Sequence, residues 1–296
     1  MLDPITITVV ILLGVSFGMI GAMISRNRKT ALLLNEKLSK PRREILLKHF
    51  PRYAAIPASL RDDFEGIVNV LMHRKRFVPC GGLEEITDKQ KVLICAQAAL
   101  PIVALPNHKF YPRLKSILVY PGAFRDRGRR RWGISEEEST HSNLGESWQT
   151  GSVILSWDSV VAGAANDDDG MNVVIHEFAH QLDQVDGAAD GIPILKNRAA
   201  YKRWVEVFYR NYEKLVEEVE AGKGERSFLD PYGATNPAEF FAVAAETFFE
   251  EALDLKIKHP DLYAELSSYF HLDPASWDET YSSKLTDSEW NPKSSS

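Results

Sequence analysis

The chain has 296 residues, of which 44% are hydrophobic and 26% are charged, a composition that can bury a core and excludes a disordered polypeptide. Its net charge of -6 argues against a nucleic-acid-binding protein, because such proteins are usually basic. The two cysteines, Cys80 and Cys95, form no Cys-x-x-Cys pair. We therefore expect neither a disulfide framework nor a cysteine-ligated metal site, and no direct nucleic-acid partner.

An uncharged and mostly aliphatic run occupies residues 5–24. A helix that crosses a bilayer needs about 20 such residues. Gly14 and Gly18 give this run a small-residue face that could pack against another helix. A cleaved signal peptide is the alternative, but it would carry lysine or arginine before the apolar run, where the only charge is Asp3. The sequence therefore predicts an uncleaved transmembrane anchor over residues 1–25.

Basic side chains follow this run and none precedes it. By the positive-inside rule, the rest of the chain then lies in the cytoplasm. We therefore predict a single-pass membrane protein whose globular part is cytoplasmic. Residues 26–57 are punctuated by prolines and are predicted to be a juxtamembrane linker.

Helical periodicity predicts helices over about 58–78 and 90–104, and short β-branched runs predict strands over 116–120 and 152–157. The basic run at 125–131 is predicted to form an exposed hairpin loop. Further helices are predicted over about 170–183, 196–220 and 236–252. Residues 276–296 are rich in serine and charge and are predicted to be disordered.

The pattern His-Glu-Phe-Ala-His occurs at residues 176–180, within one of these helices. His176 and His180 are four residues apart and share one helix face, so their imidazoles can bind one ion, and nitrogen ligands suit Zn²⁺. Glu177 lies beside the first histidine, where it can take a proton from water and pass it to a leaving amine. Without a metal, the apolar helix would bury these polar groups at a cost.

A catalytic zinc site needs a third protein ligand and leaves a fourth position for water. Glu239 and Glu246 are candidates, because they lie two turns apart on one face of an otherwise apolar predicted helix. Glu239 could instead close a capping box with Asn236. Glu246 could instead form a buried salt bridge or a hydrogen bond to a ligand histidine. Spacing alone does not choose between these alternatives.

The segment at 176–183, followed by the segment from Tyr232 to Glu246, resembles the Mlc titration factor A family of zinc metallopeptidases. The sequence is similar, more distantly, to the catalytic domain of anthrax lethal factor. The segments at 118–124 and 147–157 also fit the titration-factor family, and the resemblance covers about residues 60–274.

The resemblance implies that His176, His180 and Glu239 bind one Zn²⁺ per chain. It implies that Glu177 is the general base and that Tyr232 donates a hydrogen bond to the oxyanion of the tetrahedral intermediate. Glu246 then becomes a candidate partner of a ligand side chain. Asp183, one turn past the second histidine, is another such candidate or simply a charge near the helix end.

The fold that the resemblance implies is α+β: a zincin-like domain of the gluzincin type, with a small mixed sheet and an active-site helix. The one N-terminal transmembrane helix, predicted from the apolar run, precedes this domain and departs from the best-known members of the family. The domain is expected over residues 58–275. We predict a membrane-tethered, regulatory zinc peptidase, aminopeptidase-like by resemblance, that acts on a peptide or protein substrate. The alternative is a zinc-containing binding module that captures a transcriptional repressor or a membrane partner without catalysis.

Overall fold

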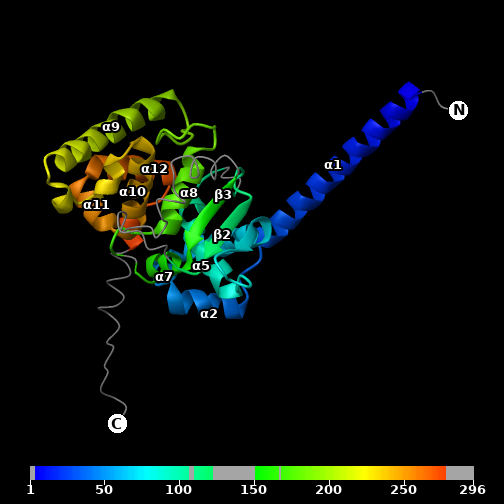
Figure 1. The fold of residues 1–296 in the computed structure, drawn as a ribbon, viewed down its shortest axis with the longest axis horizontal. Helices are drawn as coiled ribbons and strands as arrows, with labels where there is room; N and C mark the ends of the chain where they lie inside the picture. The colour runs from blue at the N-terminus through cyan, green and yellow to red at the C-terminus, as the bar shows by residue number, and fades with distance from the viewer. Residues whose placement is uncertain (1–3, 107–109, 123–150, 167, 278–296) are drawn as a thin grey trace, which may run out of the picture.

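The computed structural model describes residues 4–106, 110–122, 151–166 and 168–277. The predicted loop at 125–131 and nearly all of the predicted tail lie outside these residues. The longest helix, α1 (Pro4–Leu34), extends away from the rest of the molecule as a rod (Figure 1). It does not end at residue 25, where the predicted anchor ends, but continues through the basic residues to Leu34.

Side chains on α1 between Leu12 and Ile24 are exposed, and they are largely apolar. Within the described part of the chain, no helix combines the length and the apolar character that crossing a membrane requires. The structure therefore does not confirm the predicted transmembrane helix.

The segment predicted as a linker forms two helices, α2 (Lys40–His49) and α3 (Arg52–Ala55), that belong to the globular body. Its apolar side chains enter the main core, where Leu46, Phe50 and Ile56 are at most 2% exposed. The body continues with α4 (Ala58–Arg74), which packs against the end of α1.

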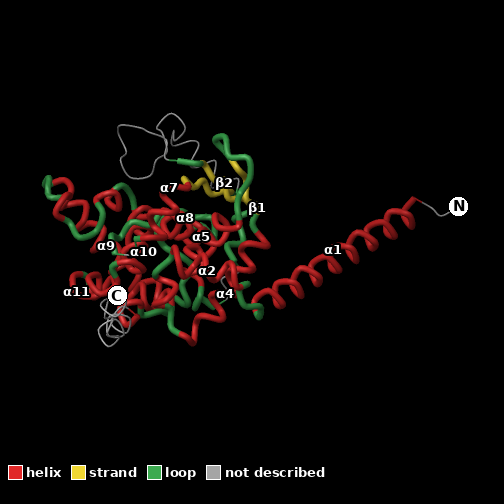
Figure 2. The backbone as a smooth tube through the Cα atoms, turned by 90° about the horizontal axis from the view of Figure 1, so that it is seen from below, coloured by secondary structure: helices red, strands yellow, loops and turns green. Residues whose placement is uncertain are grey.

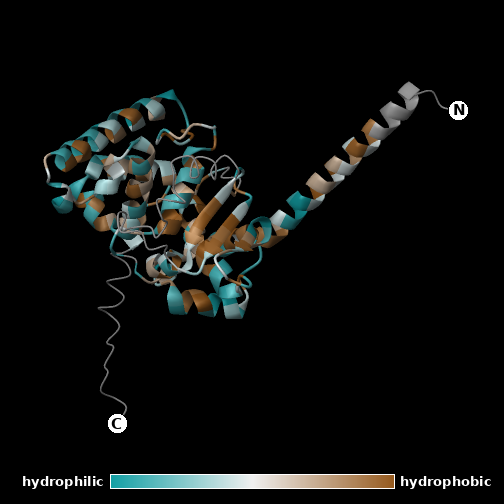
Figure 3. Ribbon diagram, viewed as in Figure 1, coloured by the Kyte–Doolittle hydropathy of each residue, from teal (hydrophilic) through white to brown (hydrophobic). Residues whose placement is uncertain are grey.

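A sheet of three strands lies beside these helices (Figure 2), in the order β1 (Arg76–Pro79), β2 (Ser116–Tyr120) and β3 (Ser152–Ser156). Both pairings are parallel, whereas a mixed sheet was predicted. Long connections permit parallel pairing, since a short hairpin joins only antiparallel strands. Between β1 and β2 the chain forms α5 (Asp88–Ala99) and η1 (Leu100–Ile102). The apolar strands β2 and β3 appear brown in Figure 3, and alternate side chains enter the core.

After β3 the described chain is helical, and the elements are α7 (Trp157–Ala165), α8 (Val173–Asp183), α9 (Arg198–Glu220), η2 (Gly224–Arg226), η3 (Pro231–Ala234), α10 (Pro237–Glu250), α11 (Ala252–Lys258) and α12 (Pro260–Phe270). The predicted α+β class, with a small sheet and mostly helices, is confirmed. Helices α8 and α10 pack against each other in the middle of the body. Aromatic side chains join α9 and α12 to α10: Phe241 on α10 lies 5.7 Å from Trp204 on α9 and 6.1 Å from Tyr269 on α12 between ring centroids.

Candidate metal centre

Helix α8 begins at Val173 because the side chain of Asn172 accepts hydrogen bonds from two backbone N–H groups of the first turn. The helix is buried along most of its length. His176 and His180 lie one turn apart on it, with their rings edge to face at 4.8 Å between centroids. The predicted pair of histidines therefore shares one buried helix face.

Helix α10 brings a carboxylate to this face. Its N-cap, Asn236, accepts a hydrogen bond from the backbone N–H of Glu239 over 3.0 Å. The carboxylate of Glu239 does not close a capping box and instead lies against the two histidines. Pro237 occupies the start of the helix, where a missing N–H costs nothing. The backbone of Glu239 thus serves the cap while its side chain faces α8.

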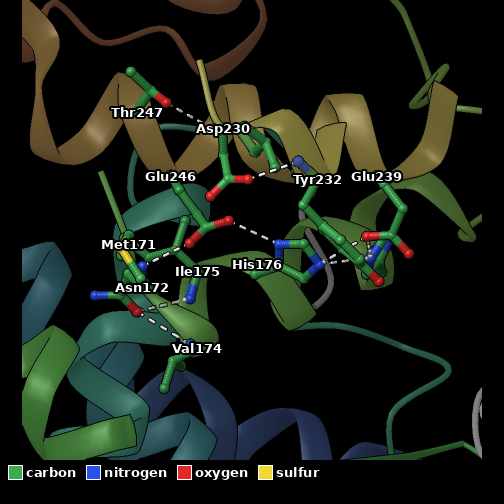
Figure 4. Close-up of polar contacts among 12 residues, drawn as sticks. Met171, Asn172, Val174, Ile175, His176, Asp230, Tyr232, Glu239, Glu246 and Thr247 are labelled. Atoms are coloured by element: carbon green, nitrogen blue, oxygen red, sulfur yellow. Dashed lines mark hydrogen bonds and ion pairs between the residues drawn. The ribbon is translucent and has the colours of Figure 1, made fainter. Parts of the chain in front are cut away.

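The three side chains converge on one point, and Figure 4 shows Glu239 beside His176. Oε2 of Glu239 is 3.0 Å from Nε2 of His176 and 3.3 Å from Nε2 of His180, and the two Nε2 atoms are 3.2 Å apart. Ligand atoms at the corners of a tetrahedron with zinc bonds of roughly 2.0–2.1 Å would be about 3.3 Å from one another. Among the described residues these three form a group that can hold a metal ion. Two imidazole nitrogens and one carboxylate oxygen fit Zn²⁺ and leave a fourth position for water.

Glu246 contacts a ligand histidine, which is one of the roles that its spacing left open. Its Oε1 atom is 2.7 Å from Nδ1 of His176, on the side of the ring opposite Glu239. Burial lowers the pKa of His176, but the two flanking carboxylates outweigh it and raise that pKa to about 10. The contact between Glu246 and Nδ1 of His176 orients the imidazole and keeps its Nε2 atom pointed at His180 and Glu239, an arrangement common around zinc. Since a metal binds the neutral ring, metal binding here displaces a proton.

Glu177 and Tyr232 lie next to this cluster. Glu177 is partly buried on α8, directly after His176. Tyr232 lies in η3, whose start is capped by Asp230 through a hydrogen bond from the backbone N–H of Tyr232. The Tyr232 ring is 6.0 Å from that of His176 between centroids. The structure therefore brings the three predicted ligands together, with Tyr232 beside His176 (Figure 4).

Residues 24–271 match the profile of a family described as glucose-regulated metallo-peptidase M90. The chain belongs to this metallopeptidase family. An uncharacterized protein of Synechocystis sp., slr2042, is 37% identical over 273 residues, which are 92% of this chain and 98% of that protein. Mlc titration factor A of Yersinia pestis is 27% identical over 260 residues, 85% of this chain and 94% of that protein. The same identity and coverage hold for Mlc titration factor A of Yersinia pseudotuberculosis. The resemblance to the titration-factor family is thus confirmed.

Asn172 and Glu250 support the metal centre of this M90 chain, and they were not identified from the sequence. Asn172 donates from Nδ2 to Oε1 of Glu250 over 2.9 Å, and the backbone N–H of Met171 donates to Oε2 over 2.7 Å. Glu250 is 5% exposed, and burial raises the pKa of its carboxyl group well above the usual value. Its spacing of four from Glu246, within an apolar helix, is the signal that could have indicated it.

Asp183 is fully buried at the C-terminal end of α8. Its Oδ2 atom accepts a hydrogen bond from the backbone N–H of Gly191 over 3.0 Å. Burial raises the pKa of this carboxyl group to about 6. This hydrogen bond is to the loop after α8, which favours the interpretation that Asp183 holds this loop rather than a ligand histidine.

Proposed function

We propose that this M90 peptidase hydrolyses peptide bonds with one zinc ion held by His176, His180 and Glu239. The observation that carries the proposal is the convergence of these three side chains at ligand distances. Glu177 directly follows the first of them on α8. A structural zinc site would be closed by four protein ligands, whereas the described part of the chain offers three here. The family membership supports the same reaction class.

When bound, the zinc ion would polarise the scissile carbonyl and make the attacking water more acidic. Glu177 accepts the proton of that water and passes it to the leaving amine. Tyr232 donates a hydrogen bond from its hydroxyl group to the oxygen of the scissile carbonyl as negative charge develops there. Glu246 holds the ring of His176 throughout, because it is bound at the nitrogen that faces away from the site.

Substitution of the general base tests this assignment. Glu177→Gln is expected to keep zinc at one per chain and to lose most hydrolysis of a peptide library, since the amide cannot accept a proton. Glu213→Gln on α9, where the side chain is exposed, is the matched control and should leave both quantities unchanged. Full activity in a zinc-loaded Glu177→Gln protein would contradict the mechanism. Comparing free with acetylated N-termini in the library tests aminopeptidase-like specificity.

Capture of a regulatory protein is a second candidate, favoured by the name of the relatives, Mlc titration factor A, which describes titration of Mlc. The experiment measures binding of a purified Mlc-type repressor to the wild type and to Glu177→Gln. If Glu177→Gln still binds the repressor, capture does not depend on catalysis. Absence of binding to either protein would remove this candidate.

We also propose that α1 attaches the chain to a membrane, with the peptidase in the cytoplasm. Two features support this: the exposed apolar side chains between Leu12 and Ile24, and the exposed basic residues Arg26, Arg28 and Lys29 that follow. The full chain should sediment with membranes, and a chain that begins at residue 26 should not. Activity of an export-dependent reporter fused after Ser296 would refute the cytoplasmic placement.

A further inference from the structure

The start of α8 is attached to the C-terminal half of α10 by a set of short hydrogen bonds. The backbone N–H of Asn172 donates to Oε2 of Glu246 over 2.6 Å. One turn further along α10, Glu250 accepts from the backbone N–H of Met171 and from Nδ2 of Asn172. Each oxygen of the two carboxylates therefore has a partner at the start of α8 or in its first turn (Figure 4 shows those of Glu246).

These two carboxylates are buried side by side, at 2% and 5% exposure. Like charges in such a place are costly unless donors surround them. The segment that leads into α8 supplies donors, namely the backbone N–H groups of Met171 and Asn172 and the side-chain amide of Asn172. The dipole of α8 also favours negative charge at this end. The arrangement therefore requires α8 to begin at one place relative to α10.

Asn172 connects this attachment to the helix itself. Its Oδ1 atom accepts hydrogen bonds from the backbone N–H groups of Val174 and Ile175, at 3.1 and 3.0 Å. Its Nδ2 group donates to Glu250 and to the carbonyl of Gly163. One side chain thus caps α8 and joins it to α10, one turn before the first histidine.

We propose that Glu250 is a positioning residue for the metal centre: by holding Asn172, it sets α8 so that His176 meets Glu239. Glu250 is hydrogen-bonded to Met171 and Asn172 rather than to His176 or Glu239, so its effect on the site is transmitted through Asn172. This inference rests on the metal site proposed above. It adds a requirement beyond the three ligands, namely a carboxylate at position 250.

The test measures zinc affinity by competition with a fluorescent chelator, using the full chain. Glu250→Gln keeps the shape but replaces one acceptor oxygen with a donor group that faces another donor. Asn172→Ser keeps an N-cap but cannot reach Glu250. Each substitution should weaken zinc binding by about 10- to 100-fold, the usual effect of residues that support metal ligands. The double variant should lose no more zinc affinity than the weaker-binding of the two single variants, because the two residues act as one unit.

Thr247→Val is the control, because it removes a buried hydrogen bond, from the hydroxyl of Thr247 to the carbonyl of Val243, whose two partners both lie in α10. It should lower stability yet leave zinc affinity unchanged.

Failure of the wild type to bind zinc would refute the metal site itself. If the wild type binds zinc, three results would overturn the role of Glu250: both single variants binding within twofold of wild type, losses that multiply in the double variant, or an equal loss in Thr247→Val. Should Glu250→Gln not fold, Asn172→Ser alone decides the matter, because it retains the cap.

Discussion

Tyr232 approaches the metal centre from η3, outside both ligand helices. Its ring packs near His176, so Tyr232→Phe should keep that packing and lose only the hydroxyl group. We expect kcat to fall about 100- to 1,000-fold, the usual cost of one lost donor to an oxyanion, with KM and zinc content little changed. Steady-state kinetics on one peptide together with metal analysis check this. A fall in zinc content would instead indicate a structural role for the hydroxyl.

Asp183 gives the site region a pH dependence. Its folded-state pKa of about 6 lies above the value of about 3.9 for an unfolded chain, so between these pH values the folded protein binds the proton more readily. Its contribution to stability is therefore complete below about pH 4 and is lost as the pH rises through about 6. At neutral pH the ionised carboxylate costs on the order of 1–3 kcal/mol.

Asp183→Asn resembles the protonated acid and keeps an oxygen for the N–H of Gly191. The variant should therefore gain stability relative to wild type as the pH rises from 4.5 to 7.5. Urea unfolding at these two pH values, with a chelator present to remove any metal, measures the difference. A constant difference across this range would show that Asp183 does not titrate in it.

At the scale of elements, the loop between α8 and α9 joins three helices at Gly191. Its N–H donates to Asp183 on α8, and its carbonyl accepts from the indole N–H of Trp204 on α9 over 3.0 Å. A Cβ atom at Gly191 would lie 2.3 Å from the carbonyl oxygen of Pro237, and φ there is 77°. Only glycine fits this contact, which sets the start of α10 two residues before Glu239.

Gly191→Ala should therefore push the first turn of α10 away and weaken zinc binding as well as stability. Gly222→Ala is the matched control, since its φ is 68° but nothing lies within 4 Å of the added carbon. Both variants incur backbone strain of about 1–3 kcal/mol. Only Gly191→Ala should lose zinc affinity in chelator competition. Equal affinity in the two variants would mean that the contact with Pro237 does not position Glu239.

The sequence predicted the local elements of the site better than their connections. The paired histidines follow from spacing within one helix, and α10 lies within two residues of its predicted ends. The choice between cap and ligand for Glu239 depended on how α8 packs against α10, which no local pattern encodes. Parallel pairing was missed because it is set by long crossovers. Residues 26–57 were predicted to be a linker from their prolines, although Leu46 and Phe50 are core residues.

At the scale of the whole molecule, α1 is attached to the body by a close helix crossing. A Cβ atom at Gly66 on α4 would lie 2.1 Å from the carbonyl oxygen of Leu34, at the end of α1. Two further contacts fix the chain just beyond: the side chain of Asn69 donates to the carbonyl of Glu36 over 2.6 Å, and the N–H of Leu38 donates to Glu65 over 2.8 Å. The direction of α1 relative to the metal centre is therefore set by packing (Figure 1).

Gly66→Ala tests this attachment, because alanine is the better helix former and any loss must come from the crossing itself. Gly21→Ala on α1 is the control, since nothing lies within 4 Å of the added carbon. We expect trypsin to cleave after Lys37 faster in Gly66→Ala than in wild type, while Gly21→Ala is unchanged. Equal cleavage rates in all three proteins would show that the crossing does not hold α1. Faster cleavage in Gly66→Ala alone would show that the crossing between α1 and α4 holds the end of α1 against the body.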